Sequence, residues 1–432
     1  MIRRLAALCL ALPLAAAAQT SPSPEPAAPA AQPPAASGAP AAEPAAAAAP
    51  PRSPGVTFEW GGWFQTHAWR TFGGVNANGT GSTDLPLFAV QGRDTAGVSV
   101  RQSRIRAAVG LPTDGLLRGA SAKGLVEVDF MGPVASDDAS LPAVRLRHAW
   151  MAVTWKELAN LTFTAGQTWS LFGGPNVALS LAHVAVPRFA GAGYLYRRAP
   201  QLRLGAETSG PVVLSAQVAA LAPYDRPKSA GVLVGERSGF PDVEGRVAVA
   251  VRPGGKPLLE VGASGRYGRE VYFLDGAGRD ETVEGWGASV DARVEVPHLT
   301  VMGAGFIGTA LGAYQSVAPE VRFTTDGAVA PATPKSLAVS AVRSMGLWVQ
   351  GVVTPIPVLQ GFVGYGIEEP READLPATAT VVNRNQQVSG GAILSLTSRW
   401  RVSTEVTWYL TNTQDWFRRN STQVELGSLY AF

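Results

Sequence analysis

The last ten residues of the chain, QVELGSLYAF (residues 423–432), alternate between two kinds of side chain. One parity is apolar apart from a single serine and the other is polar or small; the first holds Val424, Leu426, Ser428, Tyr430 and Phe432, and the second Gln423, Glu425 and Gly427. A period of two is that of a β-strand with one apolar face and one polar face. The chain is therefore expected to end in a strand that lies between two different environments.

This ending resembles the closing strand of bacterial outer-membrane barrels, in which a terminal Phe is characteristic. The resemblance implies a protein that crosses the membrane with strands and passes small solutes. It places Gln423 and Glu425 toward the lumen, and Val424, Leu426 and Tyr430 toward lipid.

The other end of the chain is consistent with export. Residues 1–18 read as a cleaved signal peptide, with Arg3 and Arg4 before an apolar core at 5–14 and alanines at 16–18. Cys9, the single cysteine, falls inside this signal, so the mature protein is expected to have no disulfide. Residues 19–54 are almost entirely Ala, Pro and Ser and are expected to form a disordered periplasmic linker; binding of a partner such as the cell wall is the alternative.

Composition restricts the class of protein further. Beyond the signal no apolar run reaches the roughly 20 residues that a membrane helix needs. The mean hydropathy is +0.09, and charged residues make up only 16 % of the chain, a balance typical of strands that are half apolar and half polar. The net charge of +3, without a basic run interleaved with aromatics, argues against nucleic acid as a partner.

From residue 55 onward, short alternating segments are separated by clusters of Gly, Pro, Asp and Asn. We interpret residues 55–432 as an antiparallel transmembrane β-barrel of about sixteen strands, at 56–69, 99–111, 120–132, 143–155, 160–172, 201–208, 212–221, 243–252, 258–267, 284–296, 299–308, 338–353, 359–366, 388–396, 401–410 and 423–432. Short turns alternate with long connections at 71–95, 173–199, 222–242, 310–335 and 368–386, which we expect outside the cell. Closure removes unpaired strand edges, which lipid does not tolerate.

Aromatic residues near the segment ends are expected to form girdles at the two membrane boundaries. They are Trp60, Trp63, Trp69, Trp155, Trp169, Trp400, Trp408, Tyr409 and Tyr430. The alternative is a set of core aromatics in a soluble all-β fold.

Parity within the strands assigns the charged side chains to one face. Arg104 and Arg106 alternate with Ile105, and Glu127 and Asp129 alternate with Val128. Arg145 and Arg147, and likewise Arg203, also oppose apolar neighbours. An arginine on the lipid face costs about 2–4 kcal/mol at mid-membrane, so these charges are expected to line the lumen.

The five arginines outnumber the two nearby carboxylates, which favours a net positive constriction that selects anions. Neutral pairing across neighbouring strands, with a purely structural role, is the alternative. The segment 173–199, which contains Arg188, follows the fifth predicted strand. General porins fold the loop at this position into the lumen, and an ordinary external loop is equally compatible with the sequence.

The residues do not indicate an enzyme. The four histidines are scattered without metal-ligand spacing, and no cofactor or metal is expected. Residues 303–308, GAGFIG, match a dinucleotide fingerprint only formally, because they lie inside a predicted strand. His148 has the outward parity of its strand, beside Trp150, and is expected at a subunit interface.

Four blocks carry a more specific likeness: RQSRIR (101–106), GLVEVDF (124–130), LRHAW (146–150) and GQTWS (166–170). In this order they resemble blocks of the DcaP-like outer-membrane porins. The resemblance implies a homotrimer of roughly sixteen-stranded channels that take up anionic organic acids, including dicarboxylates, with binding arginines at Arg104, Arg106, Arg145 and Arg147. The family's N-terminal extension is typically helical, which the linker 19–54 is not.

The sequence therefore predicts an anion-preferring passive porin of the bacterial outer membrane, in contact with lipid, small anionic solutes and its own copies. A phosphate-selective or general porin is the nearest alternative. An outer-membrane enzyme on a barrel and a secreted all-β adhesin are the alternatives from other classes.

Overall fold

The structure, a computed structural model, describes residues 55–77, 82–113, 115–132, 143–223, 228–229, 231–327, 335–378, 380–415 and 417–432. The predicted signal peptide at 1–18 and the predicted linker at 19–54 lie outside the described residues. No helix among the described residues is long and apolar enough to cross a membrane.

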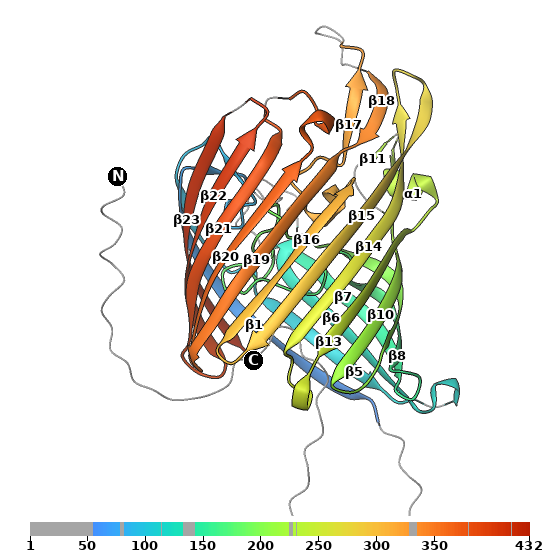
Figure 1. The fold of residues 1–432 in the computed structure, drawn as a ribbon, viewed down its shortest axis with the longest axis vertical. Coiled ribbons are helices and arrows are strands. Elements are labelled where there is room, and N and C mark those ends of the chain that lie inside the picture. Colours follow the sequence, from blue (N-terminus) through green and yellow to red (C-terminus); the bar gives the residue numbers. More distant parts are fainter. Residues whose placement is uncertain are drawn as a thin grey trace, which may run out of the picture.

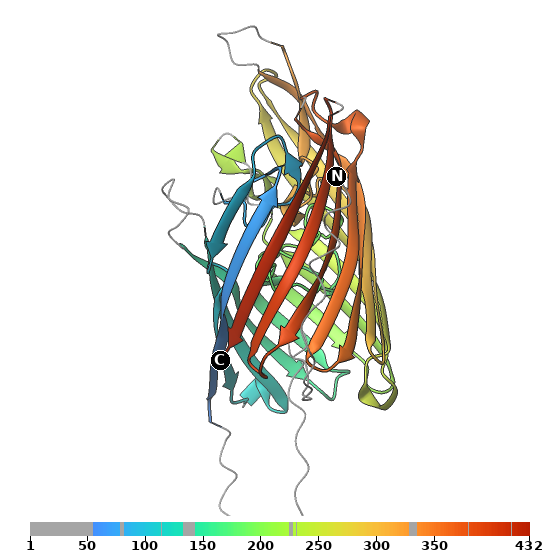
Figure 2. The ribbon, with the colours of Figure 1, turned by 90° about the vertical axis from the view of Figure 1, so that its left-hand side faces the viewer.

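The wall is one closed antiparallel sheet in which each strand pairs with its neighbours in sequence. β1 (Thr57–Phe72) pairs with the last strand, β23 (Arg418–Ala431), from Trp63↔Ala431 to Phe72↔Thr422 and so closes the barrel (Figures 1 and 2). β4 (Thr95–Ser99) and β5 (Arg104–Leu111) both pair with β1 and make one interrupted strand. The 17 strands of the sheet therefore occupy sixteen positions, which confirms the predicted all-β barrel.

The remaining wall strands follow the predicted segments closely. They are β6 (Ala120–Gly132), β7 (Ala143–Trp155), β8 (Leu161–Trp169), β9 (Arg198–Glu207), β10 (Val212–Leu221), β13 (Asp242–Val251), β14 (Leu259–Leu274), β15 (Arg279–Val296), β16 (Leu299–Thr309), β19 (Arg343–Ile356), β20 (Leu359–Pro370), β21 (Val382–Ser395) and β22 (Trp400–Thr413).

The two rims of the barrel differ, as the sequence predicted. One rim has short turns, two of which include the 3₁₀ segments Gly115–Leu117 and Pro253–Gly255. The other rim carries the long connections and the ends of β14 and β15, which extend beyond the neighbouring strands in Figure 1. Small elements within the long connections are β2 (Gly74–Val75), β3 (Ala89–Val90), β11 (Lys228–Ser229), β12 (Val232–Leu233), α1 (Val234–Ser238), β17 (Val321–Thr325), β18 (Ser336–Ala341) and the 3₁₀ segments Gly312–Tyr314 and Glu372–Asp374.

Side chains of the wall alternate between the lumen and the exterior. In β23, Glu425 is completely buried inside the barrel whereas Leu426 next to it is 58 % exposed on the outer surface. Gln423 and Tyr430 follow the same rule, the first buried and the second exposed. The predicted faces of the closing strand are confirmed.

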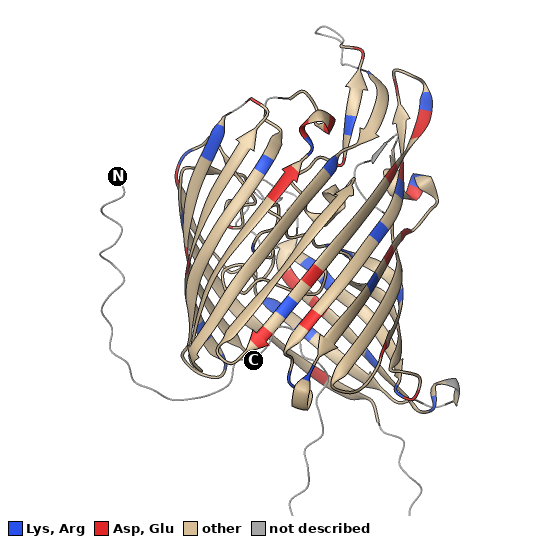
Figure 3. Ribbon diagram, viewed as in Figure 1, with Lys and Arg blue, Asp and Glu red and all other residues tan. Residues whose placement is uncertain are grey.

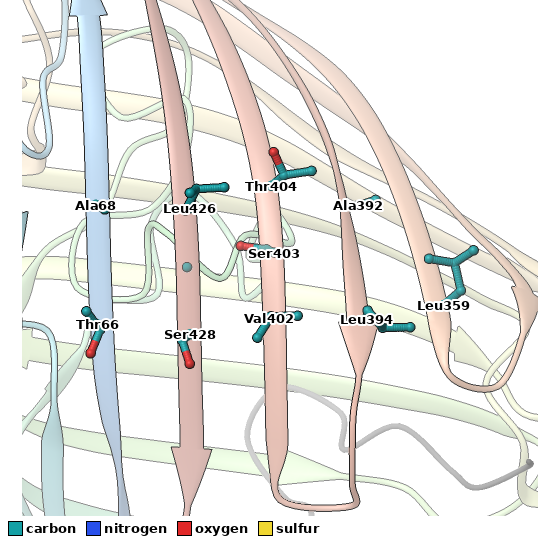
Figure 4. A pocket seen from close by; sticks show the side chains of 11 residues that line it. Thr66, Ala68, Leu359, Ala392, Leu394, Val402, Ser403, Thr404, Leu426 and Ser428 are labelled. Atoms are coloured by element: carbon teal, nitrogen blue, oxygen red, sulfur yellow. The ribbon is translucent and has the colours of Figure 1, made fainter. Parts of the chain in front are cut away.

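The outer wall has a shallow depression over β1 and β20–β23, where short side chains replace long ones (Figure 4). The residues that line it include Thr66, Ala68, Leu394, Thr404 and Leu426. These outward residues are apolar or hydroxylic, as expected for a surface that faces lipid.

The predicted aromatic girdles are confirmed only in part. Trp60, Trp400, Trp408 and Tyr430 are exposed on the outer wall. Three others were assigned wrongly: Tyr409 is completely buried inside the barrel, and Trp63 and Trp169 pack against the hydrophobic cluster in the lumen. Two loops folded into the lumen offer these rings an apolar surface, which strand parity alone does not reveal.

Candidate functional site

Charged side chains from three consecutive strands meet on the inner wall. The pairing of β5 with β6 places Arg104 opposite Asp129 and Arg106 opposite Glu127. The pairing of β6 with β7 places Arg145 opposite Asp129. Directly opposed residues in an antiparallel sheet are close enough for their side chains to touch, so the sequence spacing brings these predicted site residues together.

The contacts form one connected network. Arg145 Nη2 lies 2.6 Å from Asp129 Oδ2, and Arg147 Nη1 donates to the same oxygen at 2.8 Å. Arg147 Nε also donates to Glu127 Oε1 at 2.8 Å, and Arg104 Nη1 lies 3.3 Å from that oxygen. Three guanidinium groups therefore meet two carboxylates, so pairing and a surplus of positive charge coexist here.

A β-bulge in β7 decides how this network is built. The register shifts between Glu127, opposite His148, and Val128, opposite Leu146, which leaves Arg147 as the extra residue. Both bulge residues lie buried inside the barrel, with Arg147 1 % exposed and His148 3 % exposed. His148 Nδ1 is 3.2 Å from Thr168 Oγ1. The predicted outward position of His148 at a subunit interface is wrong, because a bulge changes the parity of the residues that follow it.

Arg198, at the start of β9, adds a cation that the sequence did not single out as a site residue. Its guanidinium stacks over the ring of Trp169 at 4.8 Å, and Arg147 stacks on the same ring at 5.8 Å. Arg198 forms no ion pair with any residue that the structure describes, and its Nη1 is buried without a hydrogen-bond partner. A buried guanidinium without an acidic partner is costly, so this position suits an anion that enters the lumen.

The other predicted arginines differ in their surroundings. Arg106 has the inward parity and lies partly exposed. Arg203 donates through Nε to Gln201 Oε1 at 3.0 Å and also to the carbonyl oxygen of Trp169. Arg104 stacks over Trp63 at 4.5 Å and donates to the carbonyl oxygen of Val184, so it contacts both the wall and the loop inside the barrel.

The connection between β8 and β9, residues 170–197, folds into the barrel. Its backbone and side chains reach inward-facing residues on opposite walls: Glu244, Ser264, Asp291, Gln350, Gln387, Glu405 and Gln102. Phe189 and Ala182 in this loop are completely buried. Of the two alternatives for segment 173–199, the inserted loop is confirmed and the external loop is wrong.

Arg188 anchors this loop to the far wall. Its Nη2 lies 3.0 Å from Glu405 Oε2 and 2.5 Å from Glu425 Oε2, and all three side chains are fully buried. His67 and His183 both contact Glu425 Oε1 at 3.0 Å. Arg188 was predicted to line the pore; the structure places it in the loop, with its side chain fully buried in an ionic network against the wall.

Two other long connections also enter the barrel. The carbonyl oxygen of Leu87 accepts hydrogen bonds from Asn385 and Gln387, both at 2.8 Å. Tyr314 donates from its hydroxyl to Glu244 Oε1 at 2.6 Å, and its carbonyl oxygen accepts from the Tyr196 backbone at 3.1 Å. These inward amides and carboxylates were not predicted as site residues. Their signal in the sequence is a polar residue on the inward parity of an otherwise apolar strand.

The described residues contain no group of three or more His, Cys, Asp or Glu side chains arranged to hold a metal ion. The charged network instead offers guanidinium donors in a partly enclosed lumen. Such donors bind carboxylate and phosphate oxygens through charge-assisted hydrogen bonds.

Comparison with known proteins identifies the fold. No family model and no curated protein sequence matches the chain. Among solved structures, the outer-membrane channel DcaP of Acinetobacter baumannii matches with a TM-score of 0.67 and 17 % identity over 88 % of this chain and 98 % of that one. An anion-selective porin from Comamonas acidovorans matches with a TM-score of 0.54 and 12 % identity, over 87 % of this chain and 100 % of that one.

OmpF of Salmonella typhi matches with a TM-score of 0.53 and 11 % identity, over 87 % of this chain and 97 % of that one. At these identities the likeness concerns the fold. The chain has the sixteen-stranded barrel of outer-membrane channels, and in fold it is DcaP-like.

Proposed function

We propose that this protein is an outer-membrane porin through which small hydrophilic anions, such as organic acids with one or two carboxylates, diffuse passively. The observation that carries the proposal is Arg198, an inward guanidinium that stacks on Trp169 and has no acidic partner among the described residues. It stands beside a network in which three arginines share two carboxylates. The surplus of positive charge attracts anions and repels cations.

The path for the solute runs along the wall formed by β5–β9. The loop 170–197 crosses the lumen to the far wall, where its hydrogen bonds to Glu405 and Gln387 hold it, and it contacts the β5–β9 wall at Arg104. Arg145, the most accessible cation of the network with 27 % of its side chain exposed, lies on the open side. An anion can exchange from Arg145 to Arg198 without leaving the wall, because Arg147 lies between them. Arg147 contacts both Asp129, the partner of Arg145, and Trp169, on which Arg198 stacks.

The test is the reversal potential of single channels in a planar bilayer under a potassium chloride gradient. The wild-type protein is expected to prefer chloride, and Arg198→Ala to lose most of that preference at unchanged folding. Arg198→Lys, which keeps the charge, is expected to retain it. Arg70→Ala is the matched control, because Arg70 forms an exposed pair with Asp94 on the outer surface. A wild-type channel that prefers potassium, or an Arg198→Ala channel with the wild-type reversal potential, contradicts the proposal.

Assembly and export belong to the same proposal. We infer a homotrimer that is embedded in lipid through its apolar outer wall, and export by removal of residues 1–18. Electrophoresis of unboiled samples is expected to give a band at about three times the monomer mass. Sequencing of the mature N-terminus is expected to begin at Gln19.

A further inference from the structure

Charges on the outer wall are confined to the rim that carries the long connections. Among the described strand residues that face outward, Arg70, Arg269, Glu284, Arg343, Glu369, Arg384 and Arg418 lie in this half of their strands. Figure 3 shows coloured bands at the upper ends of these strands, and the charged residues lower on β22 and β23, namely Arg401, Glu405 and Glu425, have the inward parity. The outer surface is therefore apolar across the membrane and carries charged side chains only near the rim with the long connections.

Two of these arginines flank one polar residue in a single row across three strands. Arg384 on β21 pairs in register with Asn412 on β22, and Asn412 pairs with Arg418 on β23. Neighbouring strands lie about 4.8 Å apart, so the two arginines are separated by roughly twice that distance. Long side chains from these positions can converge on one group above Asn412.

The rows beneath become progressively apolar. Leu410 lies between Gln386 and Asn420, and one pair further down Trp408 lies between Val388 and Thr422. Trp408 is 41 % exposed on the outer wall, as expected of the aromatic girdle. At the strand tilt of outer-membrane barrels, the row with the arginines stands about 10 Å above this ring, which is the level of lipid headgroups.

The arginines of the row retain unused donors. Arg384 contacts Glu369 on β20, yet 49 % of its side chain is exposed. Arg418 forms no ion pair with any residue in the described part of the chain and is exposed. Since exposed ion pairs contribute little and each guanidinium has several N–H donors, both can bind a phosphate.

We propose that Arg384, Asn412 and Arg418 form a binding site for the phosphorylated headgroup of a glycolipid in the extracellular leaflet. The two guanidinium groups bind phosphate oxygens from either side, and the Asn412 amide donates between them. Trp408, which is exposed on the outer wall below this row, contacts the start of the acyl chains. This site faces away from the lumen, in which Asn385 and Gln387 of the same strand hold the inserted loops, so its ligand is a lipid and not the transported solute.

The experiment uses the full-length protein in nanodiscs of phosphatidylcholine to which lipid A is added, with retained lipid counted by native mass spectrometry. Wild-type protein is expected to retain lipid A and to bind dephosphorylated lipid A at least about tenfold more weakly. The double variant Arg384→Gln/Arg418→Gln is expected to lose lipid A binding by about the same factor. Free inorganic phosphate in the buffer serves as a third probe and is expected not to compete at equal concentration, because it lacks the acyl contacts.

Arg269→Gln is the matched control. Arg269 also faces outward directly above the girdle pair Tyr267↔Trp286, but its guanidinium is engaged by Glu284 at 3.4 Å and by the Tyr267 hydroxyl at 2.9 Å, and no second arginine among the described residues stands beside it in its row. Its variant is expected to bind lipid A like the wild type. Equal binding by wild type and double variant, or loss of binding in the Arg269 control alone, overturns the proposal. Heat-modifiable migration checks that each variant is folded, and channel conductance is read separately, since the site does not depend on the proposed solute.

Discussion

Replacing Arg188 with Met tests whether the loop 170–197 is held in the barrel by its ionic anchor. Arg188 is the cation shared by Glu405 and Glu425, and the side chains of all three are fully buried. The methionine fills most of the space of the arginine but leaves two carboxylates in an enclosed site. His67 and His183, which contact Glu425, are the remaining groups that can compensate its charge.

Removing one partner from a buried ion pair costs about 3–5 kcal/mol, mainly because the other charge remains desolvated. This cost applies only while the loop is seated, since release of the loop lets water reach Glu405 and Glu425. The equilibrium between the seated and the released loop is therefore expected to shift by a factor of about 10²–10⁴ toward release.

Single-channel recording measures the result. The Arg188→Met channel is expected to conduct more and to fluctuate between at least two levels, and hydrogen exchange within the loop is expected to become faster. Replacing Glu405 and Glu425 with Gln in the same variant removes the stranded charges and is expected to restore part of the wild-type conductance. Arg70→Ala, which breaks an exposed pair, is expected to leave the loop unchanged. Wild-type conductance and exchange in Arg188→Met refute the reasoning.

Three further predictions concern the same loop and its wall. Gly366→Val is expected to raise conductance, because a Cβ at this strand position lies 2.2 Å from the Ala192 carbonyl oxygen of the loop; Gly351→Ala, where nothing lies within 4 Å, is the control. Burial and the neighbouring Arg188 lower the pKa of His183. The seated loop is therefore fully stable above the ordinary histidine pKa of about 6.5 and loses stability as the pH falls below it. Conductance is expected to rise on acidification, and a change of conductance that occurs only above that pH contradicts the prediction. Arg147→Met removes the guanidinium that joins Glu127 to Asp129, although each carboxylate keeps one arginine. The variant is expected to lower the temperature of heat-induced unfolding on gels, with a loss of stability smaller than the ~3–5 kcal/mol that follows when a buried charge has no partner left.

The sequence alone predicted most of the wall. Alternation with a period of two is a local property, because each residue of a strand points to the face opposite its neighbours. It was sufficient to place Glu425 inside and Leu426 outside, and to recognise sixteen strands with unequal connections. It also placed Arg104, Glu127 and Asp129 on one inner face, because β5 and β6 pair without a register shift.

Only the tertiary structure decided what fills the lumen. The loop 170–197 is held by Glu405 and Glu425, more than 200 positions further along the chain, and such pairing has no local pattern. The bulge at Arg147 and His148 reversed the faces of later residues in β7, including His148, because one extra residue shifts the period. The wall follows from the chemistry of each strand, whereas the constriction depends on which distant side chains the closed barrel brings to the same interior.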